Sequence, residues 1–148
     1  MPEYKTTRHV KHSAERMFDL VADIERYPEF VPLCEALIVR SRRERDGKQL
    51  VIADMTVGYK AIRETFTTQV ALDRQIRRID VKYVDGPFRF LDNQWLFEDN
   101  GENACDVKFY INYEFKNRLL GGLMGSMFDR AFRKFSEAFE VRADKIYA

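Results

Sequence analysis

The sequence contains few of the residues that most often carry metal-binding or nucleophilic chemistry. Of its 148 residues, two are cysteines and two are histidines. Cys34 and Cys105 are far apart and belong to no C-x-x-C or mixed Cys/His spacing, so they predict neither a zinc site nor a disulfide framework. His9 and His12 have no cysteine or carboxylate pattern around them. We therefore expect no metal centre, and unpaired cysteines fit a reducing cytoplasm.

Catalytic motifs and long apolar runs are missing as well. There is no H-E-x-x-H, G-x-S-x-G, P-loop or G-x-G-x-x-G motif. The uncharged run at residues 119–128 is about half of the length that spans a bilayer. The first residues, MPEYKTTRHVKHS, contain no apolar stretch, so we expect no secretory signal and no transit peptide. The sequence favours a cytoplasmic protein that is not an enzyme.

Charge of one sign does not dominate either. The chain has 25 basic and 24 acidic residues, so no overall field would steer it to nucleic acid or to an anionic membrane. The basic residues do cluster locally, and Arg40 and Arg42 are expected on one strand face with Arg43 and Arg45 on the other. Such clusters are either solvated loops or a surface that docks phosphate, from a lipid headgroup or from RNA. The arginines of interest are Arg40, Arg42, Arg43, Arg45, Arg74, Arg77 and Arg78.

Apolar and aromatic residues, by contrast, are plentiful. They make up 45% and 14% of the chain, and phenylalanine alone contributes 12 residues. This abundance predicts a bulky core or an apolar cavity. The length is that of one ordinary domain, and no repeat, linker or low-complexity segment divides it. We therefore expect a single domain over residues 1–148.

Periodicity predicts mainly strands. Residues 4–10 form a first strand, Ser13 caps a short helix, and a further helical turn near 23–27 ends at Pro28 and Pro32. Alternation with a period of two then continues through six segments joined by short turns, which implies antiparallel neighbours. These segments cover residues 36–45, 48–59, 61–73, 76–84, 88–98 and 105–116, with turn signals at Asp46-Gly47, Gly58, Asp85-Gly86-Pro87 and Asn100-Gly101.

The C-terminal part predicts one long amphipathic helix. Its apolar face includes Met124, Phe128, Phe132, Phe135 and Phe139, and the opposite face is charged. A one-sided helix needs an apolar partner, and the sheet is the only surface of matching size. The expected fold is therefore α+β, in the order β-αα-β6-α, with an antiparallel sheet of about seven strands packed on this helix.

Three glycines near the start of this helix require an explanation. Gly121, Gly122 and Gly125 each cost about 1 kcal/mol relative to alanine inside a helix. They could lie before regular helix begins, form a mobile gate, or leave space at the mouth of a cavity. Met124 and Met127 beside them offer adaptable apolar surface.

Polar residues inside the predicted strands are candidates for the polar end of a ligand cavity. Glu64 shares the parity of Ile62, Phe66 and Val70, so its carboxylate should point toward the helix side, unless it reaches solvent or an arginine. Asp92 and Gln94 raise the same question. The apolar phase slips between Phe90 and Trp95, which predicts a bulge there.

Three stretches together resemble one protein family. They are YPEFVPLC at 27–34, GPFRFLDNQWLF at 86–97 and VKFYINYEFKNRLLGGLMGSMFDRAFRKFSEAFEVRA at 107–143. They are similar to the coenzyme Q-binding, polyketide-cyclase-like family of the START-like (helix-grip) superfamily, whose bacterial members include the ribosome-association toxin. The resemblance extends from about Tyr4 to Tyr147 and departs at Leu33, where many members have a tryptophan.

The resemblance implies a curved sheet wrapped around the C-terminal helix, with an apolar tunnel that binds ubiquinone or a related prenylated quinone. It further implies a carrier or chaperone that supports respiratory electron transport, cytoplasmic or peripheral at the inner face of the cytoplasmic membrane. We name candidate ligand-binding residues as those that match the family motifs on the gripping face, together with Glu64. They are Phe30, Val31, Pro32, Glu64, Trp95, Phe97, Phe109, Met124, Met127, Phe128 and Phe132.

Two alternatives remain open. As the toxin-named members imply, the protein could bind the large ribosomal subunit and block subunit joining, with the seven arginines as RNA contacts and no binding to DNA. Relatives of the fold also include cyclases that act on polyketide-like substrates. Glu64 and Asp92, however, do not make a convergent acid/base pair.

Overall fold

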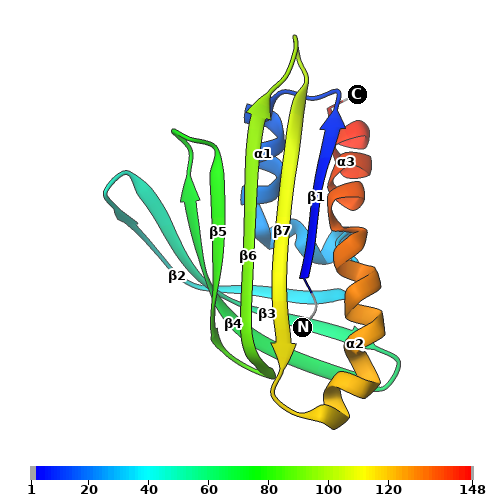
Figure 1. The fold of residues 1–148 in the computed structure, drawn as a ribbon. Helices are drawn as coiled ribbons and strands as arrows, with labels where there is room; N and C mark the ends of the chain where they lie inside the picture. The colour runs from blue at the N-terminus through cyan, green and yellow to red at the C-terminus, as the bar shows by residue number, and fades with distance from the viewer. Residues whose placement is uncertain (1–2, 148) are drawn as a thin grey trace.

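A computed structural model describes residues 3–147, so the expected domain of residues 1–148 includes three residues outside the described range. Antiparallel strands form one seven-stranded sheet in the order β1-β7-β6-β5-β4-β3-β2 (Figure 1). The strands are β1 (Glu3–Val10), β2 (Cys34–Arg45), β3 (Lys48–Tyr59), β4 (Ile62–Asp73), β5 (Arg78–Asp85), β6 (Phe88–Asp99) and β7 (Cys105–Phe115). The six predicted segments after the first helix are therefore confirmed.

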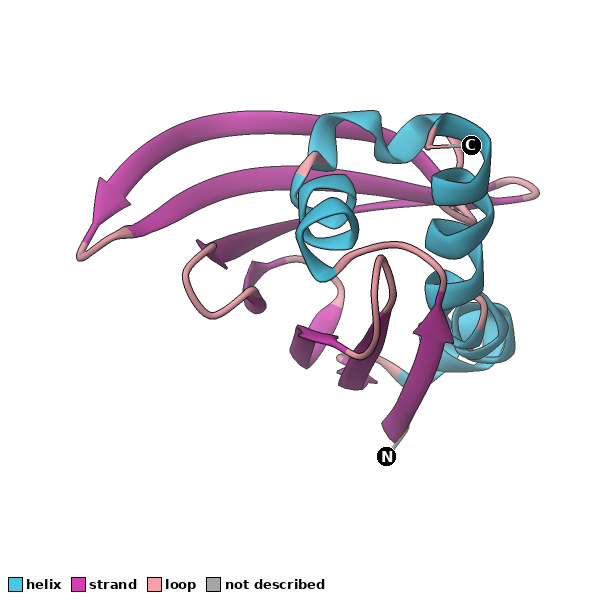
Figure 2. Ribbon diagram, turned by 90° about the horizontal axis from the view of Figure 1, so that it is seen from above, coloured by secondary structure: helices cyan, strands magenta, loops and turns pink. Residues whose placement is uncertain are grey.

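The helices lie on the concave side of this sheet. They are α1 (Ala14–Ala22), the 3-10 helix η1 (Ile24–Glu29), α2 (Arg118–Arg133) and α3 (Phe135–Ile146). Seen from above, the strands arch around them (Figure 2). The predicted α+β helix-grip architecture is confirmed. No helix within residues 3–147 is long and apolar enough to span a bilayer.

Helix α1 begins where the sequence predicts. The Ser13 side chain accepts a hydrogen bond from the Arg16 backbone N–H at 3.2 Å, which satisfies one of the free donors of the first turn. Met17, Phe18 and Val21 are buried on one face of the helix. This face packs against β6, β7 and α3.

The predicted turn at Asp46-Gly47 is present, but the turn predicted at Gly58 is not. Asp46 and Gly47 both have positive φ, as a two-residue turn of the β2–β3 hairpin requires. Gly58, however, is not a turn residue: it pairs with Arg63 inside the β3–β4 ladder, and Lys60 takes the positive φ. A Cβ at Gly58 would lie 2.2 Å from Glu35, so this glycine serves a close approach within the sheet.

The predicted bulge in β6 exists but lies earlier. The register with β7 shifts between Phe88 and Phe90, and beyond that point the pairing is regular. Phe88 is fully buried in spite of the shift. Because the phase changes before Leu91, the inward positions are Leu91, Asn93 and Trp95. Sequence alternation alone placed this shift too late.

The long C-terminal helix is divided at Lys134. Lys134 has φ −99° and ψ −2°, and its N–H bonds to the carbonyls of Ala131 and Phe132. No proline or glycine is present there, so the sequence gives no signal for the break. The turn allows Phe132 and Phe135 to meet edge to face, with ring centroids 5.1 Å apart.

The three glycines lie inside α2 and not before it. The helix begins after Asn117, whose side chain accepts from the Leu120 N–H at 2.8 Å. A Cβ at Gly122 or Gly125 would meet no atom within 4 Å, and one at Gly121 would reach only ordinary contact with Phe115 at 3.8 Å. Neither an early start nor a need for space explains them. A gating role stays a prediction.

The cysteines are buried on strands far apart in the sheet. Cys34 is in β2 and Cys105 is in β7, and four strands separate them. Burial raises the pKa of Cys34 to about 11 and that of Cys105 to about 12. Both thiols therefore stay protonated at neutral pH and are inert.

Candidate functional site: an apolar cavity between sheet and helices

An apolar cavity of about 70 Å³ lies between the concave face of the sheet and the helices. Six strands, β2 to β7, contribute one wall, and η1, α2 and α3 contribute the other. The lining consists of Ile24, Tyr27, Leu37, Ala53, Met55, Phe66, Thr68, Val70, Ile79, Val81, Leu91, Asn93, Trp95, Ile111, Phe132, Phe135 and Phe139.

Aromatic rings build the helix side of this cavity. Phe139 of α3 lies edge to face against Trp95 at 5.1 Å, against Tyr27 at 5.3 Å and against Phe30 at 5.0 Å between ring centroids. Such edge-to-face pairs fix ring orientation more strongly than aliphatic contacts do. Phe139 therefore anchors α3 and η1 to the centre of the sheet.

Hydroxyl and amide groups are few among the lining residues. Tyr27 uses its hydroxyl to donate to the Val21 carbonyl at 2.5 Å, and burial raises the pKa of this phenol, so it remains protonated. The Asn93 amide donates to the Tyr110 carbonyl at 2.8 Å. Thr68 is 7% exposed. No side chain of the lining is a carboxylate, a histidine or a lysine.

The cavity reaches the surface, but it is small. Leu37, Met55, Val81, Asn93 and Phe135 line it and are only half-buried, so they mark its outer side. A volume of 70 Å³ is roughly that of two water molecules, whereas ligand pockets usually measure about 300 to 1,000 Å³. A ligand of ordinary size therefore requires the walls to move apart.

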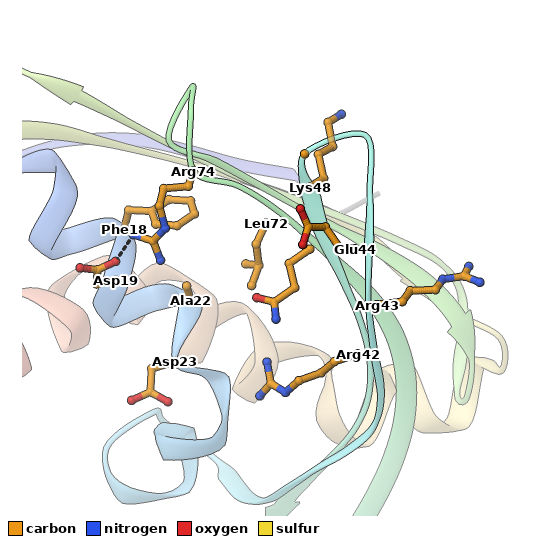
Figure 3. A pocket seen from close by; sticks show the side chains of 12 residues that line it. Phe18, Asp19, Ala22, Asp23, Arg42, Arg43, Glu44, Lys48, Leu72 and Arg74 are labelled. Carbon is orange, nitrogen blue, oxygen red and sulfur yellow. Dashed lines mark hydrogen bonds and ion pairs between the residues drawn. The ribbon is translucent and has the colours of Figure 1, made fainter.

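A second, polar groove of about 600 Å³ opens between α1 and the β2–β3 hairpin (Figure 3). Phe18, Ala22 and Leu72 contribute its apolar part. Figure 3 shows Arg42 pointing toward α1 and Arg43 pointing away from it. Two residues of this groove are close in sequence to cavity residues. Leu72 is two residues from Val70 in β4, and Ala22 is two residues from Ile24 in η1.

The predicted face assignment of the arginines is partly wrong. A bulge between Val39 and Ser41 places Arg40 beside Asp54 on the outer face, while Arg42 bonds to Glu25 at 2.7 Å on the inner side. Arg40 and Arg42 are therefore on opposite faces. Sequence parity could not show this, because the bulge inserts one residue into the strand.

Six of the seven arginines are already paired with carboxylates. The ion pairs are Arg40–Asp54, Arg42–Glu25, Arg45–Asp46, Arg74–Asp19, Arg77–Asp99 and Arg78–Asp80. Arg74 also lies over the Phe18 ring, 4.9 Å from its centroid. Arg43 has no ion-pair partner within residues 3–147. The arginines do not converge on one phosphate-sized site.

The candidate ligand-binding residues separate into three groups. Trp95 and Phe132 line the cavity. Phe30 and Pro32 line a different groove, on the outside of α3. The remaining apolar candidates lie in or beside the core but not in the lining; they are Val31, Phe97, Phe109, Met124, Met127 and Phe128.

Glu64 does not line the cavity. It shares the inward parity of Phe66, as predicted, but it pairs with Val57 near the beginning of β4 and is half-buried. Asp92 is exposed, and Gln94 faces a groove on the outer side of the sheet. The residue between them, Asn93, faces the cavity instead. The earlier position of the β6 bulge explains this difference.

Several lining residues were missed from the sequence. Leu37, Met55 and Ile79 look like ordinary core residues in their strands, and nothing in the alternation marks them as cavity residues. Thr68 had a usable signal, because it is a polar residue between Phe66 and Val70 at an inward position.

Within the described range, no group of three or more His, Cys, Asp or Glu residues could hold a metal ion.

Residues 10–140 match the family described as polyketide cyclase / dehydrase and lipid transport. The chain belongs to this family. Within it, the chain is 34% identical over 148 residues to the ribosome association toxin RatA of Escherichia coli K12, covering 100% of this chain and 90% of that protein. It is 28% identical over 149 residues to the mitochondrial coenzyme Q-binding protein COQ10 homolog B of Xenopus laevis, covering 98% of this chain and 59% of that protein.

Solved structures share the polyketide cyclase and lipid transport fold. The Zhui aromatase/cyclase from Streptomyces sp. R1128 superposes with a TM-score of 0.83 at 14% identity, covering 99% of this chain and 96% of that chain. A START superfamily protein from Mycobacterium smegmatis gives 0.81 at 19% identity, covering 97% and 98%. At these identities the likeness shows the fold alone, and that fold is the START-like helix grip.

Proposed function

We propose that the protein binds a hydrophobic molecule of the prenylated quinone class between its sheet and its C-terminal helices. The observation that carries this proposal is the cavity itself, a space between sheet and helices lined almost wholly by apolar side chains, including the tryptophan. Each methylene buried there contributes about 0.8 kcal/mol. The likeness to a protein named as coenzyme Q-binding supports the ligand class.

The proposed role is that of a carrier or chaperone in support of respiratory electron transport, and not that of an enzyme. The lining offers no carboxylate or imidazole for acid/base chemistry, and neither close relative is named as an enzyme. Such a carrier would work in the cytoplasm and touch the inner face of the membrane peripherally. Because the cavity measures 70 Å³, loading requires the half-buried side chains at its outer side to separate.

Trp95 provides the test, because it is the single tryptophan of the chain and it lines the cavity. We expect decylubiquinone to quench Trp95 emission saturably. Ala53 belongs to the lining and is 1% exposed, so Ala53→Leu should fill the cavity. We expect this variant to need at least tenfold more decylubiquinone for half-maximal quenching.

Ala71→Leu is the matched control, since it adds the same volume on the outer face of β4. It should bind like the wild type. Equal binding by all three proteins, each folded by circular dichroism, would mean that the quinone does not occupy this cavity.

A second function is favoured by the likeness to the ribosome association toxin over the full chain. In this case the protein would bind the large ribosomal subunit and block subunit joining. The exposed tip of the β2–β3 hairpin is the natural contact, because Arg43 has no carboxylate partner within residues 3–147 and Arg45 meets Asp46 only at 4.0 Å.

Co-sedimentation with large ribosomal subunits tests this second function. Binding that weakens steeply with salt, and is lost in Arg43→Glu/Arg45→Glu, would support it. Lys11→Glu/Lys145→Glu changes the net charge equally at other exposed positions and should have little effect. Binding that survives the hairpin reversal would remove the hairpin from the interface.

A further inference from the structure

Thr68 is an unusual residue for its position in the cavity wall. It faces inward from β4 between Phe66 and Val70 and is 7% exposed. Its hydroxyl makes no hydrogen bond to another side chain within residues 3–147. It is not one of the fully buried polar side-chain atoms of the described range left without a partner, which belong to Asn112, Tyr113, Ser136 and Arg142. Its place in the lining makes it available to a polar group that enters the cavity.

Asn93 is the matching group on β6. Its amide nitrogen donates to the Tyr110 carbonyl at 2.8 Å, which fixes the orientation of the side chain. The amide has two N–H groups and one oxygen, so one N–H and the oxygen remain for a ligand. Because Asn93 is half-buried on the cavity side, this group stands close to the outer end of the lining.

The two residues face the same space from either side of β5. Asn93 pairs with Val81, and Val81 pairs with Val70, which is two residues from Thr68. Two strand spacings and an offset of two residues along β4 place their backbones roughly 12 Å apart, and the concave curvature brings their side chains closer. This span suits a small ring with oxygen atoms on opposite edges, each within a hydrogen bond of one residue.

We propose that Thr68 and Asn93 bind the oxygenated head of the ligand, an inference that rests on the proposed function. Both residues can donate to a carbonyl oxygen and both can accept from a hydroxyl. The pair therefore selects an apolar molecule with an oxygenated ring over a plain hydrocarbon, and it can hold the ring in its oxidised or its reduced form. The apolar remainder of the lining holds the tail.

The test compares two probes that differ in the head alone. Decylubiquinone carries ring oxygens, and decylbenzene has the same alkyl tail on a ring without them. Binding is measured by the rise in Tm with each probe and, for the quinone, by Trp95 emission. We expect Thr68→Val and Asn93→Leu each to weaken decylubiquinone binding about tenfold and to leave decylbenzene binding within about twofold.

Two further variants separate head binding from structural effects. Thr68→Ser retains the hydroxyl and should retain the affinity. Thr65→Val removes a hydroxyl from the outer face of the same strand, where Thr65 bonds to Thr56, and should bind both probes like the wild type. Thr68→Val should lower quinone affinity without lowering the Tm of the free protein, a combination that a purely structural threonine would not produce.

The outcomes distinguish this inference from the proposed function. Unchanged decylubiquinone binding in both folded variants, or an equal loss for both probes, would overturn the role of Thr68 and Asn93 and leave the cavity as the binding site. A wild-type protein that binds the two probes equally would do the same. A wild-type protein that binds neither probe would overturn the proposed function and this inference together.

Discussion

Asp54 is the residue that ties three strands together on the outer face. It belongs to β3, accepts from the Thr67 hydroxyl of β4 at 2.6 Å, and pairs with Arg40 of β2. The side chain of Asp54 is 12% exposed, so this contact is better shielded than most surface ion pairs. The bulge that turns Arg40 outward is what makes the contact possible.

Asp54→Asn should lower stability in a pH-dependent way. The hydrogen bond from Thr67, and then Arg40, hold the pKa of Asp54 below its ordinary value. A lowered folded-state pKa stabilises the protein above the unfolded pKa, roughly 4, and this contribution is lost as the pH falls through the folded value. We expect a cost of about 1 kcal/mol at pH 7 that shrinks as the pH falls below roughly 4 and through the lowered folded-state pKa.

Urea unfolding of both proteins across this pH range measures the effect. Glu102→Gln, at an exposed turn position, is the control and should leave stability unchanged. A difference between Asp54→Asn and the wild type that stays constant with pH would show that the carboxylate charge is not what stabilises the contact.

At the scale of single residues, the sequence indicated the candidate residues better than it predicted the face of the sheet on which their side chains lie. The inward parity of Glu64 was right, but the end of the strand removes it from the cavity. Asn93 and Arg42 take faces that simple alternation does not give, because bulges in β6 and β2 shift the register. Bulges depend on how neighbouring strands pair, which one strand's sequence does not contain.

Among the elements, helix α2 contains three glycines, which lower its intrinsic helix propensity. Gly122 and Gly125 are inside it and face open space. Gly122→Ala and Gly125→Ala should each stabilise the protein by about 0.5 to 1 kcal/mol, because alanine loses less backbone entropy on folding and meets no atom. Urea unfolding measures this gain.

Gly86→Ala is the contrasting change and should destabilise by roughly 2 kcal/mol. Gly86 has φ +145°, and a Cβ there would lie 2.5 Å from the Phe66 Cβ and 2.9 Å from its Cα. If the α2 substitutions destabilise as much as this one does, then α2 packs against something that the open space around its glycines does not reveal.

The elements themselves were largely predictable. Ser13, the Asp46-Gly47 turn and the strong alternation of β7 all act locally, so the sequence shows them directly. The break at Lys134 was not predictable, because it carries no proline or glycine and serves the packing of Phe132 against Phe135. Tertiary contacts decided that boundary.

For the whole molecule, the sequence predicted the helix-grip layers but not which core residues border a space. Trp95 and Phe132 do line the cavity, whereas Phe109 and Phe128 only pack beside it. A lining residue and a core residue have the same apolar pattern along a strand. The difference arises from how the curved sheet and the divided helix fit together, and it appears only in three dimensions.

The central claim is that this interior holds a hydrophobic ligand. Organic extraction of the protein purified from its native host, followed by mass spectrometry of the extract, tests it most directly. We predict a prenylated quinone released in near-stoichiometric amount from the wild type and far less from Ala53→Leu, with Ala71→Leu unchanged. Extracts without lipid, from a protein that also fails to take up added quinone, would contradict the claim and make ribosome binding the function to pursue.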